Sequence, residues 1–193
     1  MNTPTFPPFR VLLSRDQILR RTQELARRIQ DDLRQAGAAE PPVLVAVIEG
    51  ARPFARQLQK VLPGGLPVHE VRASSYGSGT QSSGRVELST GKDLPWRGQH
   101  VLLLEDIVDT GRTIDALRRH CLGHGAASCR VATLLSKPSR RVVDVTLEYV
   151  GFTIPDEFVL GFGMDLDGRY RELPDVVVYE AEVERAFGRS GAT

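Results

Sequence analysis

Short apolar runs constrain the fold of this chain more than any other feature of its sequence. The runs lie at 41–50, 101–105 and 128–137, with a further strand candidate at 66–74. Apolar runs of this length are typical of strands that are covered on both faces, as in a parallel sheet. Helical patterns follow the first two runs, one with Pro53 near its first turn and one at about 113–123. This order predicts an α/β fold, with a mostly parallel, twisted sheet that is flanked by helices and joined by right-handed crossovers.

The parts outside these runs show other patterns. A capping box of Ser14 and Gln17 opens an amphipathic helix that is predicted to stop at Gly37. The segment 75–98 is long, polar and rich in Gly, Ser and Thr, which is typical of lids and linkers. Beyond residue 138 the helical period disappears, and short strands or extended segments are predicted.

The composition excludes several classes of protein. A formal net charge of +1 over 193 residues gives no sign of a nucleic-acid-binding surface. No apolar stretch approaches the roughly 20 residues of a membrane span, and the N-terminus lacks a signal-peptide pattern. The two cysteines, Cys121 and Cys129, suit reduced thiols in a cytosolic protein. We therefore expect one cytoplasmic domain over residues 1–193, with no nucleic-acid or membrane partner.

The run at 101–105 leads into a turn that combines carboxylates with a phosphate-binding pattern, VLLLEDIVDTGRTIDAL. In an open parallel sheet, ligands bind beyond the carboxyl ends of the strands. Glu105 and Asp106 would face opposite ways on a strand end, so both can serve one ligand only if the chain turns there. Asp109 then leads through 110–113 into a helix whose free N–H groups and dipole suit a phosphate. A capped helix with exposed acids nearby is the alternative that these residues leave open.

The string EDIVDTGRT resembles the phosphoribosyl diphosphate (PRPP) signature of phosphoribosyltransferases, and in particular that of the hypoxanthine-guanine branch. Four further segments resemble this family in the same order, so the resemblance covers roughly residues 40–180. They are VAVIEGARPFA, SSYGSGTQSSGRVEL, the strand that ends in Lys137, and FVLGFGMDLDGRYREL. The resemblance implies a type I phosphoribosyltransferase fold, with a core at about 40–137 and a small hood built from about 138–180 and the N-terminal segment.

The resemblance also implies an activity. This is the magnesium-dependent transfer of the 5-phosphoribosyl group from PRPP to hypoxanthine or guanine, a purine salvage reaction that gives IMP or GMP and pyrophosphate. The partners would be these small molecules, with the chain assembled as a homodimer or homotetramer. The alternatives are a non-catalytic regulator that senses PRPP or a nucleotide, and a phosphoribosyltransferase for xanthine or another base.

Each matching position receives a role from the resemblance. The ribose hydroxyls would be held by Glu105 and Asp106, and the 5-phosphate by Asp109, Thr110, Gly111, Arg112 and Thr113. Asp109 is also the candidate for proton transfer at the purine N7. The remaining groups are purine contacts at Lys137, Phe158, Val159 and Ile107, pyrophosphate contacts at Glu49, Gly50 and Arg171, lid residues Ser75 and Tyr76, and magnesium-associated acids Asp165, Glu105 and Asp106.

Lys137 and Glu49 stand out among these positions by their side-chain chemistry. Lys137 is one of only three lysines in the chain, and a compact ammonium can point at a single carbonyl oxygen such as the purine 6-oxo group. Glu49 departs from the family, which usually has a lysine there. An acid beside pyrophosphate is unfavourable unless it points away or is paired. The family binds pyrophosphate here largely through backbone N–H groups, often with a cis peptide, and Arg52 is a candidate substitute cation.

Overall fold

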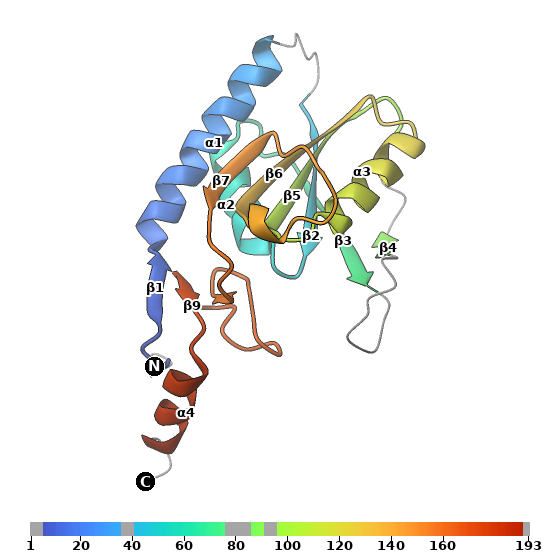
Figure 1. Cartoon of the computed structure of the whole chain (residues 1–193). Helices are drawn as coiled ribbons and strands as arrows, with labels where there is room; N and C mark the ends of the chain where they lie inside the picture. The colour runs from blue at the N-terminus through green and yellow to red at the C-terminus, as the bar shows by residue number, and fades with distance from the viewer. Residues whose placement is uncertain (1–5, 36–40, 76–85, 91–95, 191–193) are drawn as a thin grey trace.

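The computed structural model describes residues 6–35, 41–75, 86–90 and 96–190, and it confirms the predicted α/β fold. Figure 1 shows a large sheet flanked by helices, with a small group of strands below it from which the last helix projects. The elements in chain order are β1 (Arg10–Leu13), α1 (Arg15–Gln35), β2 (Val43–Ile48), α2 (Arg52–Val61), β3 (Val68–Ser75), β4 (Val86–Thr90), β5 (His100–Val108), α3 (Arg112–Gly123), β6 (Ser128–Ser136), the 3₁₀ turn η1 (Pro138–Arg140), β7 (Tyr149–Thr153), β8 (Val159–Leu160), β9 (Val176–Val178) and α4 (Ala181–Ser190).

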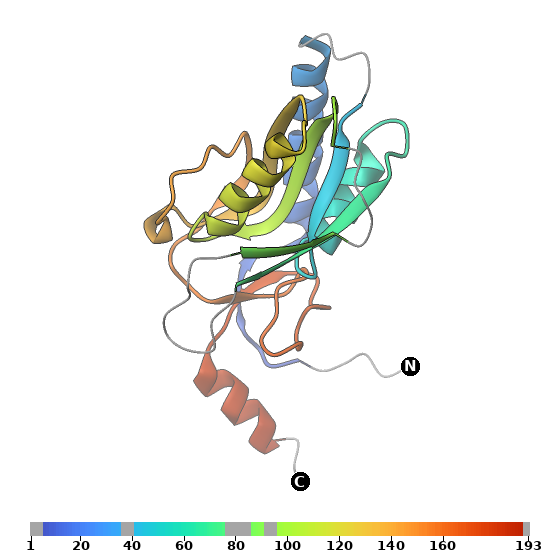
Figure 2. The ribbon, with the colours of Figure 1, turned by 90° about the vertical axis from the view of Figure 1, so that its right-hand side faces the viewer.

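The large sheet has the strand order β4-β3-β2-β5-β6-β7. All neighbours pair in parallel except β3 and β4, which are antiparallel. Side chains of β2 alternate between two apolar layers, because Leu44 and Ala46 pack with α1 and α2 whereas Val45 and Val47 pack with α3. Figure 2 shows α3 in front of the sheet and α1 behind it. The prediction of strands covered on both faces is therefore confirmed.

The two ends of the chain meet in a small antiparallel sheet of order β1-β9-β8. Val178 of β9 pairs with Arg10 on one side and with Val159 on the other. This sheet confirms the predicted hood, which joins the C-terminal segment to the N-terminal region. The division of the chain near residue 137 stays a prediction. β7 lies beyond that point and nevertheless pairs with β6, so it belongs to the large sheet.

The structure contains elements that the sequence patterns do not predict, among them β1, β4 and α4. β4 lies inside the polar segment 75–98 and pairs antiparallel with β3. α4 lies in the region where no helix is expected. Glu184 of α4 accepts hydrogen bonds from the hydroxyls of Tyr170 (2.6 Å) and Tyr179 (2.8 Å) and pairs with Arg169 (2.7 Å). Val183 of α4 also packs against the apolar cluster of the hood. α4 has only 10 residues, which is fewer than the roughly 11–18 over which a hydrophobic period is recognised.

The predicted N-terminal helix and its capping box are confirmed, while its predicted stop at Gly37 lies outside the described residues. The backbone N–H of Ser14 donates to Gln17 Oε1 at 2.8 Å, and the N–H of Gln17 donates to Ser14 Oγ at 3.3 Å, which is the expected capping box. Among the described helices, none combines the length and apolarity that a membrane span requires. Ser75 is the last residue of β3, and Tyr76 lies outside the described residues.

Candidate active site

The acids of the turn lie on and just beyond β5, which is longer than predicted. The strand continues to Val108 instead of ending at residue 105, and Glu105 still pairs in register with Thr133 of β6. The expected turn at Glu105 and Asp106 is therefore wrong, because the ladder with β6 continues past both residues. A side-chain hydrogen bond nevertheless joins the two carboxyl groups, so both can serve one ligand without a turn. Glu105 is buried, with 7% of its surface exposed, while Asp106 lines a hollow beside the strand end.

That hollow has a volume of about 260 Å³ and lies at the carboxyl ends of β5 and β6. It is lined by Asp106, Ile107, Asp109, Lys137, Phe158, Val159, Met164 and Asp165. All of these except Met164 are predicted site residues, and they come from β5, the end of β6 and the hood. The hollow therefore offers charged groups beside an aromatic and apolar surface, as a ligand with unlike ends requires.

Glu105 and Asp106 form no ion pair among the described residues, and Glu105 Oε2 has no hydrogen-bond partner. Burial raises the pKa of Glu105 well above its ordinary value, and the charge of Asp106 adds to this effect. Burial also raises the pKa of Asp106, although a hydrogen bond to Glu105 and, to a smaller extent, the charge of Arg171 act in the opposite direction. The ligand-free site thus disfavours both negative charges, and a ligand with hydroxyl donors would stabilise them.

The predicted phosphate turn has the backbone geometry that its sequence requires. Gly111 has a φ of 85°, and a Cβ there would lie 2.7 Å from the carbonyl oxygen of Val143, so only glycine fits. α3 begins directly after it at Arg112, whose N–H donates to Thr110 Oγ1 at a long 3.5 Å, and Gly111 has no side chain to cap the helix. The first turn can therefore receive an anion. The carbonyl of Thr110 accepts hydrogen bonds from the N–H groups of Val142 and Val143, both at 3.1 Å, which fixes the turn from below.

The predicted purine contacts lie on the other side of the hollow. Lys137 directly follows β6 and is buried, and its N–H donates to the carbonyl of Val108 at 3.0 Å. Phe158 is 53% exposed, which is unusual for a large aromatic side chain. Its ring meets the ring of Tyr179 edge-on at 5.8 Å, and the N–H of Tyr179 donates to its carbonyl. An exposed aromatic face that is held in place can stack against a planar base.

The first loop, 48–52, lies against Asp106. A Cβ on Gly50 would lie 1.9 Å from Asp106 Oδ2, so the backbone of the loop approaches the carboxylate directly. The hood packs against the same loop, since a Cβ on Gly163 would lie 2.1 Å from the carbonyl oxygen of Gly50. Arg171 donates to the carbonyl of Gly163 at 2.8 Å and pairs with Asp165 at 2.8 Å. The structure thus brings Gly50, Arg171 and Asp165 to the edge of the hollow beside Asp106.

Glu49 itself is paired, which removes the electrostatic conflict raised by its sequence. The Ile48–Glu49 peptide bond is cis. The Glu49 carboxylate pairs with Arg52 and with Arg72, the latter at 2.8 Å. Arg52 also makes a two-pronged pair with Glu70, at 2.7 and 2.9 Å, which raises the pKa of Arg52 and lowers that of Glu70. Since two carboxylates engage Arg52, it is not a free substitute cation.

The acids of the site suit a hard cation, although they do not form a complete cage. Among the described residues, no group of three His, Cys, Asp or Glu side chains is arranged to hold a metal ion. Asp106 and Asp165 line the same hollow with oxygen ligands. Mg²⁺ keeps several waters and is usually held by one or two carboxylates plus substrate phosphates, so these residues fit it.

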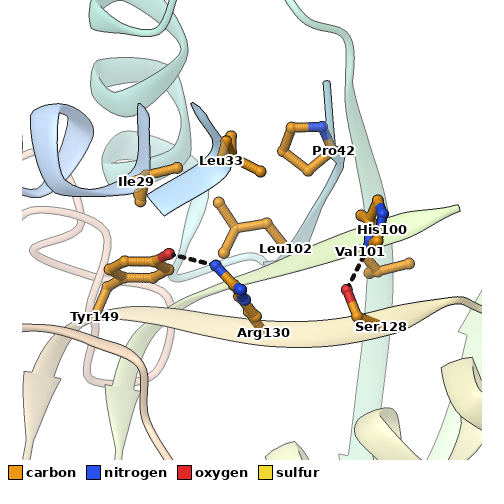
Figure 3. Close-up of a pocket in the computed structure, with 9 residues that line it drawn as sticks. All are labelled: Ile29, Leu33, Pro42, His100, Val101, Leu102, Ser128, Arg130 and Tyr149. Carbon is orange, nitrogen blue, oxygen red and sulfur yellow. Dashed lines mark hydrogen bonds between the residues drawn. The ribbon is translucent and has the colours of Figure 1, made fainter. Parts of the chain in front are cut away.

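Another hollow lies at the opposite end of the same strands (Figure 3). It has a volume of about 120 Å³ and a mainly apolar lining under α1, with Ile29, Leu33 and Leu102 among its residues. Its polar groups already have partners, because Arg130 donates to the Tyr149 hydroxyl at 3.1 Å and His100 Nδ1 lies 2.8 Å from Ser128 Oγ. Its place at the amino ends of the strands sets it apart from the site of expected chemistry.

The sequence does not reveal two charged residues that contact the predicted site. Arg140 Nε donates to both carboxylate oxygens of Asp109, at 2.8 and 3.0 Å. Asp156 lies between Arg140 and Lys137, at 3.5 and 4.0 Å respectively. No period or motif indicates these contacts, because they depend on how η1 folds back over the phosphate turn.

The family model of the phosphoribosyl transferase domain matches residues 13–167 of this chain. A hypoxanthine-guanine phosphoribosyltransferase of Streptococcus thermophilus is 40% identical over 174 residues, which are 90% of this chain and 94% of that protein. The chain belongs to the hypoxanthine-guanine phosphoribosyltransferase family. The enzyme of that name from Lactococcus lactis is 38% identical, over 90% of this chain and 92% of its own length.

Solved structures of this phosphoribosyltransferase family have the same fold. A hypoxanthine phosphoribosyl transferase of Trypanosoma cruzi matches with a TM-score of 0.85 and 35% identity, over 98% of this chain and all of that one. A hypoxanthine-guanine phosphoribosyltransferase of Bacillus anthracis matches with a TM-score of 0.81 and 38% identity, over 88% and 98%. The family resemblance and the predicted fold are therefore confirmed, and the role of each site residue stays a prediction.

Proposed function

We propose that this chain transfers the 5-phosphoribosyl group of PRPP to hypoxanthine or guanine and so produces IMP or GMP and pyrophosphate. The observation that carries the proposal is the single hollow in which Asp106, Asp109, Lys137 and Phe158 meet beside the phosphate turn. The purine, the ribose and the 5-phosphate would each meet a group of suitable chemistry there. Membership of the hypoxanthine-guanine phosphoribosyltransferase family supports the same reaction.

The sugar end of PRPP would bind along β5. Glu105 and Asp106 would accept hydrogen bonds from the ribose hydroxyls, which are good donors to carboxylates. The N–H groups of 110–113, the hydroxyls of Thr110 and Thr113 and the charge of Arg112 would hold the 5-phosphate. The bond to C1 breaks with oxocarbenium-like character on the sugar, as in glycoside cleavage, and nearby carboxylates stabilise that positive charge.

The purine would bind between Lys137 and Phe158. Lys137 would donate to the 6-oxo group, Phe158 would stack on the base, and Ile107 and Val159 would complete the pocket. Asp109 lies between the phosphate turn and the purine side, so it is the residue that would accept or donate the proton at N7. A positioned acid–base group of this kind contributes typically about 10²–10⁴-fold to the rate.

The pyrophosphate would leave past the first loop. The backbone of Glu49 and Gly50 and the side chain of Arg171 would bind it, and Asp165 with Asp106 would hold Mg²⁺. Bound Mg²⁺ would neutralise the charge of the departing pyrophosphate. Ser75 and Tyr76 keep their predicted role in a lid that excludes water. We further propose a cytoplasmic homodimer or homotetramer, which the mass of the purified protein would test.

A substrate panel tests the proposed function. Purified protein with PRPP and Mg²⁺ is given hypoxanthine, guanine, xanthine or uracil, and nucleotide formation is followed by ultraviolet absorbance. We expect turnover with hypoxanthine, guanine or both, and none with uracil. Turnover with xanthine or another base alone would contradict the proposed substrate. A protein that binds PRPP and forms no nucleotide would be the non-catalytic regulator.

A further inference from the structure

Asp109 is held by an arginine from a distant part of the chain. Arg140 Nε donates to Asp109 Oδ1 at 2.8 Å and to Oδ2 at 3.0 Å. η1 brings Arg140 to this place, because the chain on both sides of it is tied to the turn. Just before η1, the backbone N–H of Lys137 donates to the carbonyl of Val108. Just after η1, the backbone N–H of Val142 donates to the carbonyl of Thr110. The contact therefore belongs to the fold of the loop.

Arg140 also connects Asp109 to Lys137. Its Nη1 lies 3.5 Å from Asp156 Oδ2, and Asp156 Oδ1 lies 4.0 Å from Lys137 Nζ. The four side chains form a series of alternating charge in the order Asp109, Arg140, Asp156, Lys137. Its two ends are the groups that the proposed function places at N7 and at the 6-oxo oxygen. N7 and the 6-oxo oxygen lie on the same edge of the purine. The distance between the Asp109 carboxylate and the Lys137 ammonium therefore decides whether one bound purine can contact both groups.

We propose that Arg140 is a positioning residue for the purine, which sets Asp109 relative to Lys137 through Asp156. This inference rests on the proposed function and assigns it one further residue. A guanidinium suits the role because its planar fork can donate to two carboxylates in a fixed geometry. An ionised carboxylate accepts at up to about four lone-pair positions, so Arg140 leaves part of Asp109 free for the base. Arg140 is not among the residues that line the hollow, so it acts through Asp109.

The alternatives for Arg140 are a purely structural ion pair and a contact to the 5-phosphate. A structural ion pair would affect folding, but the side chain is 48% exposed, and such pairs contribute only about 0.2–1 kcal/mol. A phosphate contact would affect PRPP affinity. A positioning role affects turnover with the purine while the fold and PRPP binding are kept. The three roles therefore predict different measurements.

Replacement of Arg140 by Gln separates these roles. We expect kcat to fall about tenfold with saturating PRPP, since small errors in the placement of a catalytic group are costly. The KM for PRPP and the melting temperature should stay close to those of the wild type. Arg140→Lys should recover part of the loss, because it keeps the charge and loses the fork. Arg119→Gln is the matched control, since Arg119 forms an exposed ion pair with Asp115 on α3, and it should keep full activity.

A double-mutant cycle tests whether Arg140 acts through Asp109. In an Asp109→Asn background, Arg140→Gln should change kcat by less than about twofold, because the group that it positions is already lost. An additive loss, a higher KM for PRPP or an unchanged kcat in Arg140→Gln would each overturn the inference. Failure of the proposed function is visible separately. A wild-type protein that forms no nucleotide from hypoxanthine or guanine would overturn both.

Discussion

The acids on β5 and the acid on the first loop are neighbours in the site, but in the part of the chain that the structure describes only the acid on the loop is paired with arginines. On β5, Glu105 is buried and Asp106 is partly buried, neither forms an ion pair among the described residues, and both have raised pKa values. On the first loop, the side chain of Glu49 is 33% exposed and pairs with Arg52 and Arg72. The two parts touch where Gly50 packs against Asp106. The acids on β5 and the acid on the loop therefore differ in their charged partners, although they lie close together.

The comparison separates acids that serve a ligand from acids that serve the fold. A buried carboxylate without a cation destabilises the protein, so it is retained only where a ligand supplies the missing partner. A carboxylate between two arginines already has charged partners, and their positive charge offsets its repulsion of an approaching phosphate. Asp109 is intermediate, since it faces the hollow and pairs with Arg140. The order of expected mutational effects follows this division.

Asp109→Asn should have the largest effect on activity. The substitution keeps the size of the side chain and removes its ability to take the N7 proton, so kcat should fall by about 10²–10⁴-fold. The KM for PRPP should change little, because the phosphate turn and the acids on β5 remain. Steady-state kinetics with hypoxanthine or guanine would check this. Near-normal turnover would reject Asp109 as the proton-transfer group and leave it with a role in binding alone.

The fold was readable from the sequence where one physical rule dominates. The apolar runs of β2, β5 and β6 predict buried parallel strands, because both faces of each strand must be covered. α4 is shorter, and besides the packing of Val183 it is held by Glu184 through the hydroxyls of Tyr170 and Tyr179. Hydrogen bonds between distant side chains leave no periodic signal. The sequence could therefore indicate the hood without its last helix.

The site was predictable at the residue level but not in its internal partners. Gly111 is predictable because a tight turn before a helix needs positive φ, and the observed φ is 85°. The extent of β5 past residue 105 was missed, since polar residues normally mark the end of a buried run. The partners of Glu49 were also missed, because Arg72 lies on β3, 23 residues later. Pairing across a parallel sheet depends on register, which a single sequence does not give.

Gly50→Ala tests the place where the two acidic parts touch. The new Cβ would lie 1.9 Å from Asp106 Oδ2, so either the loop or the carboxylate must move. We expect the KM for PRPP to rise by roughly tenfold, since a displaced group misaligns the substrate. Overpacking should also cost about 1–3 kcal/mol of stability. Gly123→Ala is the control, because a Cβ at the end of α3 meets nothing within 4 Å. Equal behaviour of the two variants would show that the contact is irrelevant.

Glu105→Gln should stabilise the protein without ligand and weaken PRPP binding. The pKa of Glu105 is raised in the folded protein above its ordinary 4.5, so its contribution to stability is fully present below pH 4.5 and is lost as the pH rises through the folded value. Glutamine carries no charge at any pH. The variant should therefore melt about 2–4 °C above the wild type at pH 8, for a gain of about 1 kcal/mol.

Melting curves between pH 5 and 8 would measure this difference, which should shrink as the pH falls. PRPP should raise the melting temperature of Glu105→Gln less than that of the wild type, because one acceptor for the ribose is weakened. Glu24→Gln on α1 is the control, as its side chain is 54% exposed. A lower melting temperature for Glu105→Gln at pH 8 would mean that its carboxylate is satisfied within the fold, like that of Glu49.

Glu49→Gln should have the smallest effect. It removes ion pairs to Arg52 and Arg72, and partly exposed pairs contribute about 0.2–1 kcal/mol each, so the melting temperature should fall by only a few degrees. Since the first loop would bind pyrophosphate through its backbone, kcat/KM should stay within about threefold of the wild type.

Glu49→Lys sharpens the same comparison, because it restores the usual family residue beside two arginines. Like charges at this spacing repel, so Glu49→Lys should be less stable than Glu49→Gln. The double variant Glu49→Lys with Arg72→Glu exchanges the charges of the pair and should recover part of the loss in melting temperature. A Glu49→Lys protein that is more stable or more active than the wild type would show that the lysine works without the surrounding arginines. The ion pairs of Glu49 would then not stabilise the first loop.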